Sequence, residues 1–246
     1  MKPVQPAIHY FDSVSSTLDK GRELVKAGRL NLWDSVVAMS QNAGRGQLRR
    51  KWASPPGNLY AAMLLPPEAP FNSSAAAIAF GALCASALAE LGAPVFLKWP
   101  NDLVVIRKGA PEKVGGILLE ESDGATIAGI GINLASAPNE SSMRPGHAIP
   151  AGTLADNISL SPQELWQRVV KGILKAYKSR LSCASAWRHM AEARLLWLNQ
   201  PVKMDETGAT GILRGIDAQG AALLENNGII TAHINGSMTS ADMVTL

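Results

Sequence analysis

The sequence predicts an α+β protein with two domains: a larger domain that combines strands with helices, and a small C-terminal β-barrel. The chain has 246 residues, enough for one large and one small domain, and 47% of them are hydrophobic, which is ample for a core. The composition shifts at Asn199-Gln200-Pro201, after which short Val/Ile/Leu runs alternate with glycine turns, as in small barrels. We therefore expect domains at 1–198 and 199–246.

Capping residues and apolar runs predict the helices. Ser16 with Asp19 three residues later is a variant of the capping box that begins a helix. Ser161, Pro162 and Glu164 form a complete start signal, with Ser at the N-cap, Pro at the first helical position and Glu at the third. We expect helices at about 16–28, 75–91, 162–181 and 185–198.

Short apolar runs between turn residues predict the strands. Pro66-Pro67 stops one run, and Pro100-Asn101-Asp102 joins two others as a turn. A loop rich in Pro, Gly, Ser and Asn follows from 136 to about 152, and Asn227-Gly228 marks a tight hairpin in the C-terminal domain. We expect strands in the larger domain at 35–40, 58–65, 95–99, 103–106, 114–121 and 126–134.

The segment from Gln41 to Trp52 is a basic loop that contains two glycines, four cations and a tryptophan. Glycines let the backbone approach a ligand, arginines bind phosphate or carboxylate with two donors, and an indole offers a flat face to a ring. A nucleotide would fit such a loop, although neither the P-loop spacing nor the dinucleotide fingerprint is present. An exposed basic hairpin without a ligand has the same composition.

Three further motifs follow this loop and, together with Ser16-Thr17, carry a family resemblance. They are Lys98-Trp99-Pro100-Asn101-Asp102, the run Lys113-Val114-Gly115-Gly116-Ile117-Leu118-Leu119-Glu120, and Gly129-Ile130-Gly131-Ile132-Asn133-Leu134. Their order and spacing resemble the biotin–protein ligases, which activate biotin with ATP and transfer it to a lysine of a biotin carboxyl carrier protein. The resemblance covers nearly the whole chain. It implies a mixed sheet backed by helices, of the class II aminoacyl-tRNA synthetase/biotin synthetase type, and an SH3-like C-terminal domain.

The resemblance implies a biotin site in which hydroxyls contact the ureido group, an amide contacts the fused rings, and loop backbone together with Lys113 contacts the carboxylate. A hydroxyl suits the ureido group because it both donates and accepts. Helix capping alone would also explain the two hydroxyl residues. The implied biotin residues are Ser16, Thr17, Leu18, Gln41, Gly44, Arg45, Gly46, Gln47, Lys113, Gly115 and Gly116.

The resemblance also implies an ATP site and three catalytic residues. Joining a carboxylate to a triphosphate brings two anions together, so cations must offset their repulsion. Asp102 is expected to orient or deprotonate the carrier lysine, or to hold Mg²⁺ through water. The implied ATP residues are Arg45, Trp52, Lys98, Asn101, Lys113 and Asn133, and the implied catalytic residues are Lys113, Arg45 and Asp102. ATP with Mg²⁺ is expected as co-substrate, with no resident metal or prosthetic group.

The chain departs from the family pattern at three positions. Gln47 stands where an arginine is usual, Arg49 where a glycine is usual, and Leu18 where an asparagine is usual. These changes bear on ligand affinity and on the path of the basic loop. Because residues 42–51 have little apolar surface to bury, we expect this loop to be mobile in the free protein and to close over the ligand.

The net charge, the residues before Ser16 and the cysteine count restrict the classes of function that fit the sequence. A net charge of +3 without a basic arm gives no support for DNA binding, and too few residues precede Ser16 for a helix-turn-helix, which favours a ligase without a DNA-binding domain. Two cysteines, no signal peptide and no membrane segment favour a cytoplasmic protein. A homodimer through the catalytic sheet fits the resemblance. The alternatives are a lipoate/octanoate-type ligase of the same fold, a non-catalytic biotin-binding module, and an RNA-binding protein.

Overall fold

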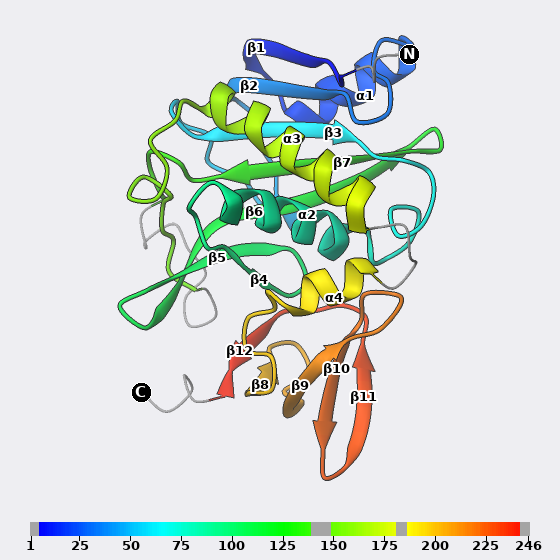
Figure 1. The fold of residues 1–246 in the computed structure, drawn as a ribbon, viewed down its shortest axis with the longest axis vertical. Helices are drawn as coiled ribbons and strands as arrows, with labels where there is room; N and C mark the ends of the chain where they lie inside the picture. The colour runs from blue at the N-terminus through cyan, green and yellow to red at the C-terminus, as the bar shows by residue number, and fades with distance from the viewer. Residues whose placement is uncertain (1–4, 139–148, 181–185, 242–246) are drawn as a thin grey trace.

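The computed structural model describes residues 5–138, 149–180 and 186–241. Two sheets dominate this part of the chain (Figure 1). The large sheet is seven-stranded, in the order β1-β2-β3-β7-β6-β5-β4; β1 and β2 pair in parallel and all its other neighbours are antiparallel. The small sheet is five-stranded and antiparallel, in the order β11-β10-β9-β8-β12. The predicted mixed sheet with helices and a separate C-terminal β unit is confirmed.

The strands of the large sheet are β1 (Ile8–Val14), β2 (Ser35–Gln41), β3 (Leu59–Leu64), β4 (Phe96–Lys98), β5 (Asp102–Arg107), β6 (Ala110–Ser122) and β7 (Ala125–Ile132). The strands of the small sheet are β8 (Pro201–Met204), β9 (Thr210–Ile216), β10 (Ala222–Asn226), β11 (Ile229–His233) and β12 (Met238–Ser240). The helices are α1 (Thr17–Lys26), α2 (Ala76–Glu90), α3 (Pro162–Arg180) and α4 (Ala186–Glu192), with a short 3₁₀ turn η1 (Gln47–Arg49).

Helices cover both faces of the large sheet. Successive residues of a strand point to opposite faces, so one strand can supply apolar side chains to the core on each side. In β2, Val36 belongs to the apolar cluster under α1, whereas its neighbour Val37 belongs to the main core under α2 and α3. Helix α2 is apolar on all sides and almost entirely buried, as expected for a helix between a sheet and a second helix. Trp166 of α3 reaches the sheet and donates its indole N–H to Ser35 Oγ at 2.9 Å.

The two predicted capping boxes differ in outcome. At α3 the box is complete, since the Ser161 backbone N–H donates to Glu164 Oε2 at 3.0 Å and the Glu164 N–H donates to Ser161 Oγ at 3.3 Å. At α1, Ser16 caps the helix by accepting from the Leu18 N–H at 3.1 Å. The side chain of Asp19, however, bonds to arginines and to Ser15 instead of closing a box, so that part of the prediction is wrong.

Two elements of the large domain differ from expectation. Strand β1 was not predicted. The helix expected over 185–198 ends at Glu192, because the following residues pair with β4: Leu97 N–H donates to Arg194 O at 2.8 Å, and Leu196 N–H donates to Leu97 O at 2.8 Å. The expected end of α3 at 181, the expected start of the next helix at 185 and most of the loop over 136–152 lie outside the described residues.

The small sheet packs at the β4 end of the large one (Figure 1). Its predicted hairpin is confirmed, since Asn227 and Gly228 join β10 to β11 with φ of 50° and 78°. Trp99 donates its indole N–H to Gly220 O at 2.9 Å, and so fixes the small sheet against the turn that follows β4. Among the helices of the described ranges, none is long and apolar enough to cross a membrane.

Candidate active site

The candidate site lies on the α1 face of the large sheet, where three neighbouring strands place paired residues in one row. Asp102 of β5 pairs with Gly116 of β6, and Gly116 pairs with Gly131 of β7. Paired residues share a face of the sheet, so a carboxylate stands beside two positions that lack side chains. This row leaves a stretch of backbone open to close approach.

The Trp52 ring packs against this glycine row. A Cβ atom on Gly131 would lie 2.7 Å from the nearest Trp52 ring atom, and one on Gly116 would lie 3.4 Å away, so a side chain at Gly131 would displace the indole. Leu18 of α1 packs against the next position on this face, Gly129, where a Cβ atom would lie 2.9 Å from the nearest Leu18 side-chain atom. The Trp52 indole N–H is buried and has no acceptor among the described residues.

Lys113 and Asp102 form an ion pair next to Trp52. The distance from Lys113 Nζ to Asp102 Oδ1 is 2.5 Å, and Nζ lies 5.7 Å from the centroid of the Trp52 ring. The two side chains are 30% and 19% exposed, so an anion from solvent can reach the lysine. A cation, a carboxylate and an aromatic face therefore converge, and the structure brings together the candidate residues Lys113, Asp102, Trp52 and Gly116. Gly115 is different, because it packs closely against Gly131 O.

A second polar group lies at the N-terminus of α1. Gln41 Oε1 accepts from the Thr17 backbone N–H at 2.8 Å and from Thr17 Oγ1 at 3.2 Å, and Gln41 Nε2 donates to Ser54 Oγ at 3.0 Å. Ser16 and Thr17 are buried. The structure thus brings together Ser16, Thr17 and Gln41 from segments that are distant in sequence, and adds Ser54, which sequence reasoning missed.

The basic loop folds as a short hairpin. Arg45 and Lys51 form an antiparallel bridge, Gly46 N–H donates to Arg50 O at 2.8 Å, and Trp52 N–H donates to Gly44 O at 2.9 Å. Gly44 is buried at the base of the hairpin, where a Cβ atom would lie 2.6 Å from Ser54 Oγ. Gln47 is exposed at the start of η1. The left-handed backbone falls on Leu48, with φ of 55°, rather than on Arg49.

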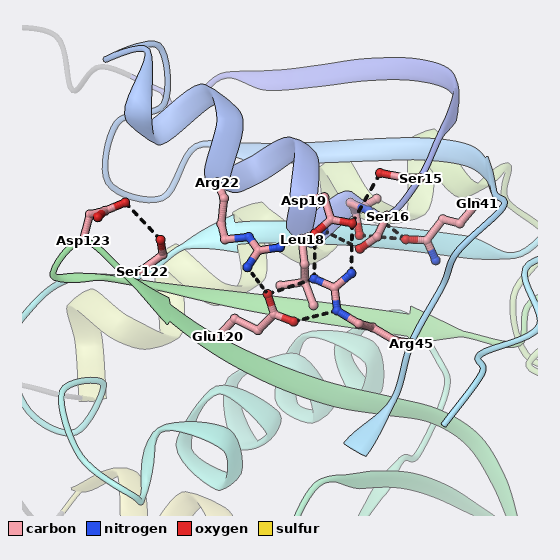
Figure 2. Close-up of polar contacts among 11 residues, drawn as sticks. Ser15, Ser16, Leu18, Asp19, Arg22, Gln41, Arg45, Glu120, Ser122 and Asp123 are labelled. Atoms are coloured by element: carbon pink, nitrogen blue, oxygen red, sulfur yellow. Dashed lines mark hydrogen bonds and ion pairs between the residues drawn. The ribbon is translucent and has the colours of Figure 1, made fainter. Parts of the chain in front are cut away.

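The side chain of Arg45 contacts two carboxylates, as Figure 2 shows. Its guanidinium donates to both oxygens of Asp19 at 2.8 and 2.9 Å and to both oxygens of Glu120 at 2.7 and 2.9 Å. The hydrogen bonds from Arg45, assisted by those from Arg22, lower the pKa of Asp19 against partial desolvation. Glu120 and then Asp19 raise the pKa of Arg45. Sequence reasoning missed both carboxylates as partners of this arginine.

The remaining three predicted residues use their polar groups within the protein. Lys98 is 4% exposed and donates to Ser237 Oγ, just before β12, at 3.0 Å; burial lowers the pKa of this lysine. Asn101 Nδ2 donates to Ile117 O at 2.6 Å. Asn133 is 4% exposed and its Nδ2 donates to Gly152 O at 3.1 Å. Within residues 5–138, 149–180 and 186–241, no group of three His, Cys, Asp or Glu side chains is arranged to hold a metal.

Comparison with known proteins agrees with this geometry. Residues 10–136 match the model of the biotin/lipoate A/B protein ligase family, and the chain belongs to that family. It is 32% identical to the bifunctional ligase/repressor BirA of Salmonella typhimurium, over 93% of this chain and 77% of that protein. It is also 32% identical to the biotin–[acetyl-CoA-carboxylase] ligase of Paracoccus denitrificans, over 77% of this chain and 82% of that protein.

Solved structures give the same result. The biotin protein ligase from Aquifex aeolicus in complex with biotin and ATP has a TM-score of 0.73 and 29% identity to this chain. The match covers 95% of this chain and 97% of that one, so the similarity includes the small C-terminal sheet as well as the large one. The fold is therefore that of the biotin protein ligases.

Proposed function

We propose that this protein forms biotinyl-5′-AMP from biotin and ATP and then transfers biotin to a lysine of a biotin carboxyl carrier protein. Family membership and the relatives named as biotin–[acetyl-CoA-carboxylase] ligases support this function. The observation that supports it most within the chain is the convergence of Lys113, Asp102 and Trp52 on the glycine row. Beside that row, Lys113 provides a positive charge for a phosphate and Trp52 an aromatic face for a ring.

In the first step, a biotin carboxylate oxygen attacks the α-phosphorus of ATP. A new oxygen–phosphorus bond forms, the bond to the β-phosphate bridge breaks, and pyrophosphate leaves with both electrons. We assign to Lys113 the offset of negative charge at the α-phosphate, because its amine is partly exposed and is fixed by Asp102 at 2.5 Å. Mg²⁺ would enter with the triphosphate, as this ion usually does, with Asp102 able to bind it through water.

In the second step, the amine of the carrier lysine attacks the carbonyl carbon of biotinyl-5′-AMP. A carbon–nitrogen bond forms, the carbon–oxygen bond to the phosphate breaks, AMP leaves with its electron pair, and the amine loses a proton. We assign to Asp102 the orientation of this amine, since it is the carboxylate in the row beside Lys113. A carboxylate there can accept a hydrogen bond from the neutral amine and take up the proton that the amine loses as the carbon–nitrogen bond forms.

We place the biotin rings beside Thr17, Gln41 and the Trp52 indole that covers the glycine row. The Thr17–Gln41–Ser54 hydrogen bonds fix the amide of Gln41 at the base of the hairpin, and such prepared polar groups suit the ureido ring. Trp52 O accepts from Ser54 Oγ at 3.2 Å, its ring centroid lies 5.7 Å from Lys113 Nζ, and its buried N–H remains available for an acceptor. For Arg45 we propose a contribution through the loop backbone, since its guanidinium is bonded to two carboxylates.

The following assignments are also proposals. The macromolecular substrate is the carrier domain of a biotin-dependent carboxylase, and the protein acts in the cytoplasm. The catalytic domain ends at residue 198 and the small domain begins at 199. Self-association would use the large sheet, in which the edge strand β1 pairs only with β2 among the described strands. Lys98, Asn101 and Asn133 are assigned to the ATP side of the site.

The decisive experiment compares acids as substrates. Pyrophosphate release with ATP is measured with biotin, lipoate or octanoate, and labelled biotin is then chased onto a purified carrier domain. We expect pyrophosphate release with biotin but not with lipoate or octanoate, and we expect labelled biotin on the carrier domain. Release with lipoate or octanoate but not biotin would assign the chain to the other branch of its family. Biotin binding without pyrophosphate release would indicate a binding module.

A further inference from the structure

Four charged residues connect the basic hairpin to the sheet and to α1. Asp19 and Arg22 come from α1, Arg45 from the hairpin and Glu120 from β6, and their charges sum to zero (Figure 2). Glu120 also lies 3.4 Å from Arg22 Nη1, and Arg22 pairs with Asp19. Each carboxylate therefore contacts both arginines. The catalytic assignments above use neither of these two acids.

The Arg45 side chain anchors the hairpin to α1 and β6. The tip is solvated, with Leu48 83% exposed, so little apolar burial fixes it. The side chains of Arg45, Asp19 and Glu120 are only 23%, 32% and 20% exposed. Two parallel bonds to each carboxylate give a guanidinium one orientation, which a single exposed ion pair does not. The position of the hairpin backbone therefore depends on these two acids.

We propose that Asp19 and Glu120 are positioning residues: through Arg45 they hold the basic hairpin over the glycine row and so limit escape of the adenylate before transfer. The proposal rests on the proposed function, since an adenylate must form for its escape to be measured. The hairpin leads directly into Trp52, and the Trp52 N–H bonds to Gly44 O at 2.9 Å. Release of Arg45 therefore loosens the segment that also places the indole in the site.

The test uses the Asp19→Asn/Glu120→Gln double variant, which keeps size and removes both negative charges. Arg45→Lys is the second variant, since lysine keeps the charge but cannot make paired parallel bonds to two carboxylates. The matched control is Asp123→Asn, which breaks the 3.5 Å contact with Lys26 at a site where both side chains are 63% exposed. Asp123 lies on the same side of the sheet in the turn after β6 (Figure 2).

Hydrogen exchange of residues 43–52 is measured without ligand and with biotin plus ATP. We expect the double variant to lose loop protection by about tenfold, Arg45→Lys to lose a smaller part, and Asp123→Asn to match the parent protein. Protection of β6 and β7 reports whether the domain remains folded. The comparison with ligand also tests the predicted closure of the loop.

The second readout is the partition of biotinyl-5′-AMP between release into solution and transfer to the carrier. We expect the released fraction to rise about tenfold in the double variant, an effect that lower global stability alone would not produce. Unchanged loop protection in the folded double variant, or an equal loss in Asp123→Asn, would overturn the proposal. If the parent protein forms no adenylate, the proposed function fails, whereas the exchange data still decide whether the two acids hold the hairpin.

Discussion

Replacing Lys113 with alanine tests whether this lysine acts in adenylation or only stabilises the fold. The change removes the cation 2.5 Å from Asp102, where negative charge would gather in adenylation. Loss of one such electrostatic contact costs on the order of 10²–10³ in rate, or about 3–4 kcal/mol in the barrier. Both side chains are partly exposed, so loss of the ion pair should reduce the free energy of unfolding by only about 1 kcal/mol. In a chain of this size that lowers Tm by about 2–4 °C.

The assay is single-turnover formation of biotinyl-5′-AMP, with Tm measured on the same samples. Lys171→Ala, at an exposed position on α3, is the matched control and should keep both values. Adding Asp102→Asn to Lys113→Ala removes the unpaired carboxylate, so Tm should recover while adenylation stays slow. Near-normal adenylation by folded Lys113→Ala would refute the charge argument. A rate loss that recovered together with Tm would assign Lys113 a structural role instead.

Three further perturbations have defined outcomes. Gly131→Val should displace Trp52, whose ring lies 2.7 Å from where the Cβ would be, and slow adenylation about 100-fold; indole fluorescence unchanged from the parent would contradict this. The pKa of Asp19 lies below its ordinary value of 3.8, so the stabilisation of the hairpin by ionised Asp19 is complete above pH 3.8 and is lost as pH falls through the lowered pKa. Hydrogen-exchange protection of the loop should therefore stay constant from pH 7 to about pH 5 and fall below about pH 3.8. Ser35→Ala removes the acceptor of the buried Trp166 N–H and should cost about 1–3 kcal/mol in urea unfolding, whereas a cost near zero would show that the indole finds another partner.

Most elements of the large domain were predictable because local chemistry marks their ends. The strand expected at 58–65 is β3, which stops before Pro66-Pro67, and the complete capping box places the start of α3 correctly. The helix expected to reach residue 198 fails for a tertiary reason. Its residues have good helix propensity, but backbone bonds of Arg194 and Leu196 to β4 compete successfully. Such pairing across about 100 residues of chain leaves no local mark.

The candidate site was predictable where motifs carry it and unpredictable where contacts are long-range. Lys113 and Asp102 were predicted as catalytic residues and Trp52 as an ATP contact, and the three side chains lie together in the structure, while their roles stay predictions. The partners of Arg45 lie 26 and 75 positions away in the chain. Both partners are residue types common on protein surfaces, one in the first turn of a helix and one on a strand. Only the assembled fold therefore shows that they form ion pairs with Arg45.

One short hairpin both anchors Arg45 to two carboxylates and places Trp52 on the large sheet. One strand of it carries Arg45 to the acids on α1 and β6, and the other ends in Trp52 on the bare backbone of Gly131. The Trp52 N–H to Gly44 O bond closes the base between them, at a position too tight for a side chain. Movement at either anchor must therefore pass to the other. We therefore expect residues remote from the lysine–carboxylate pair to affect how long a ligand stays beside it, without contacting that ligand.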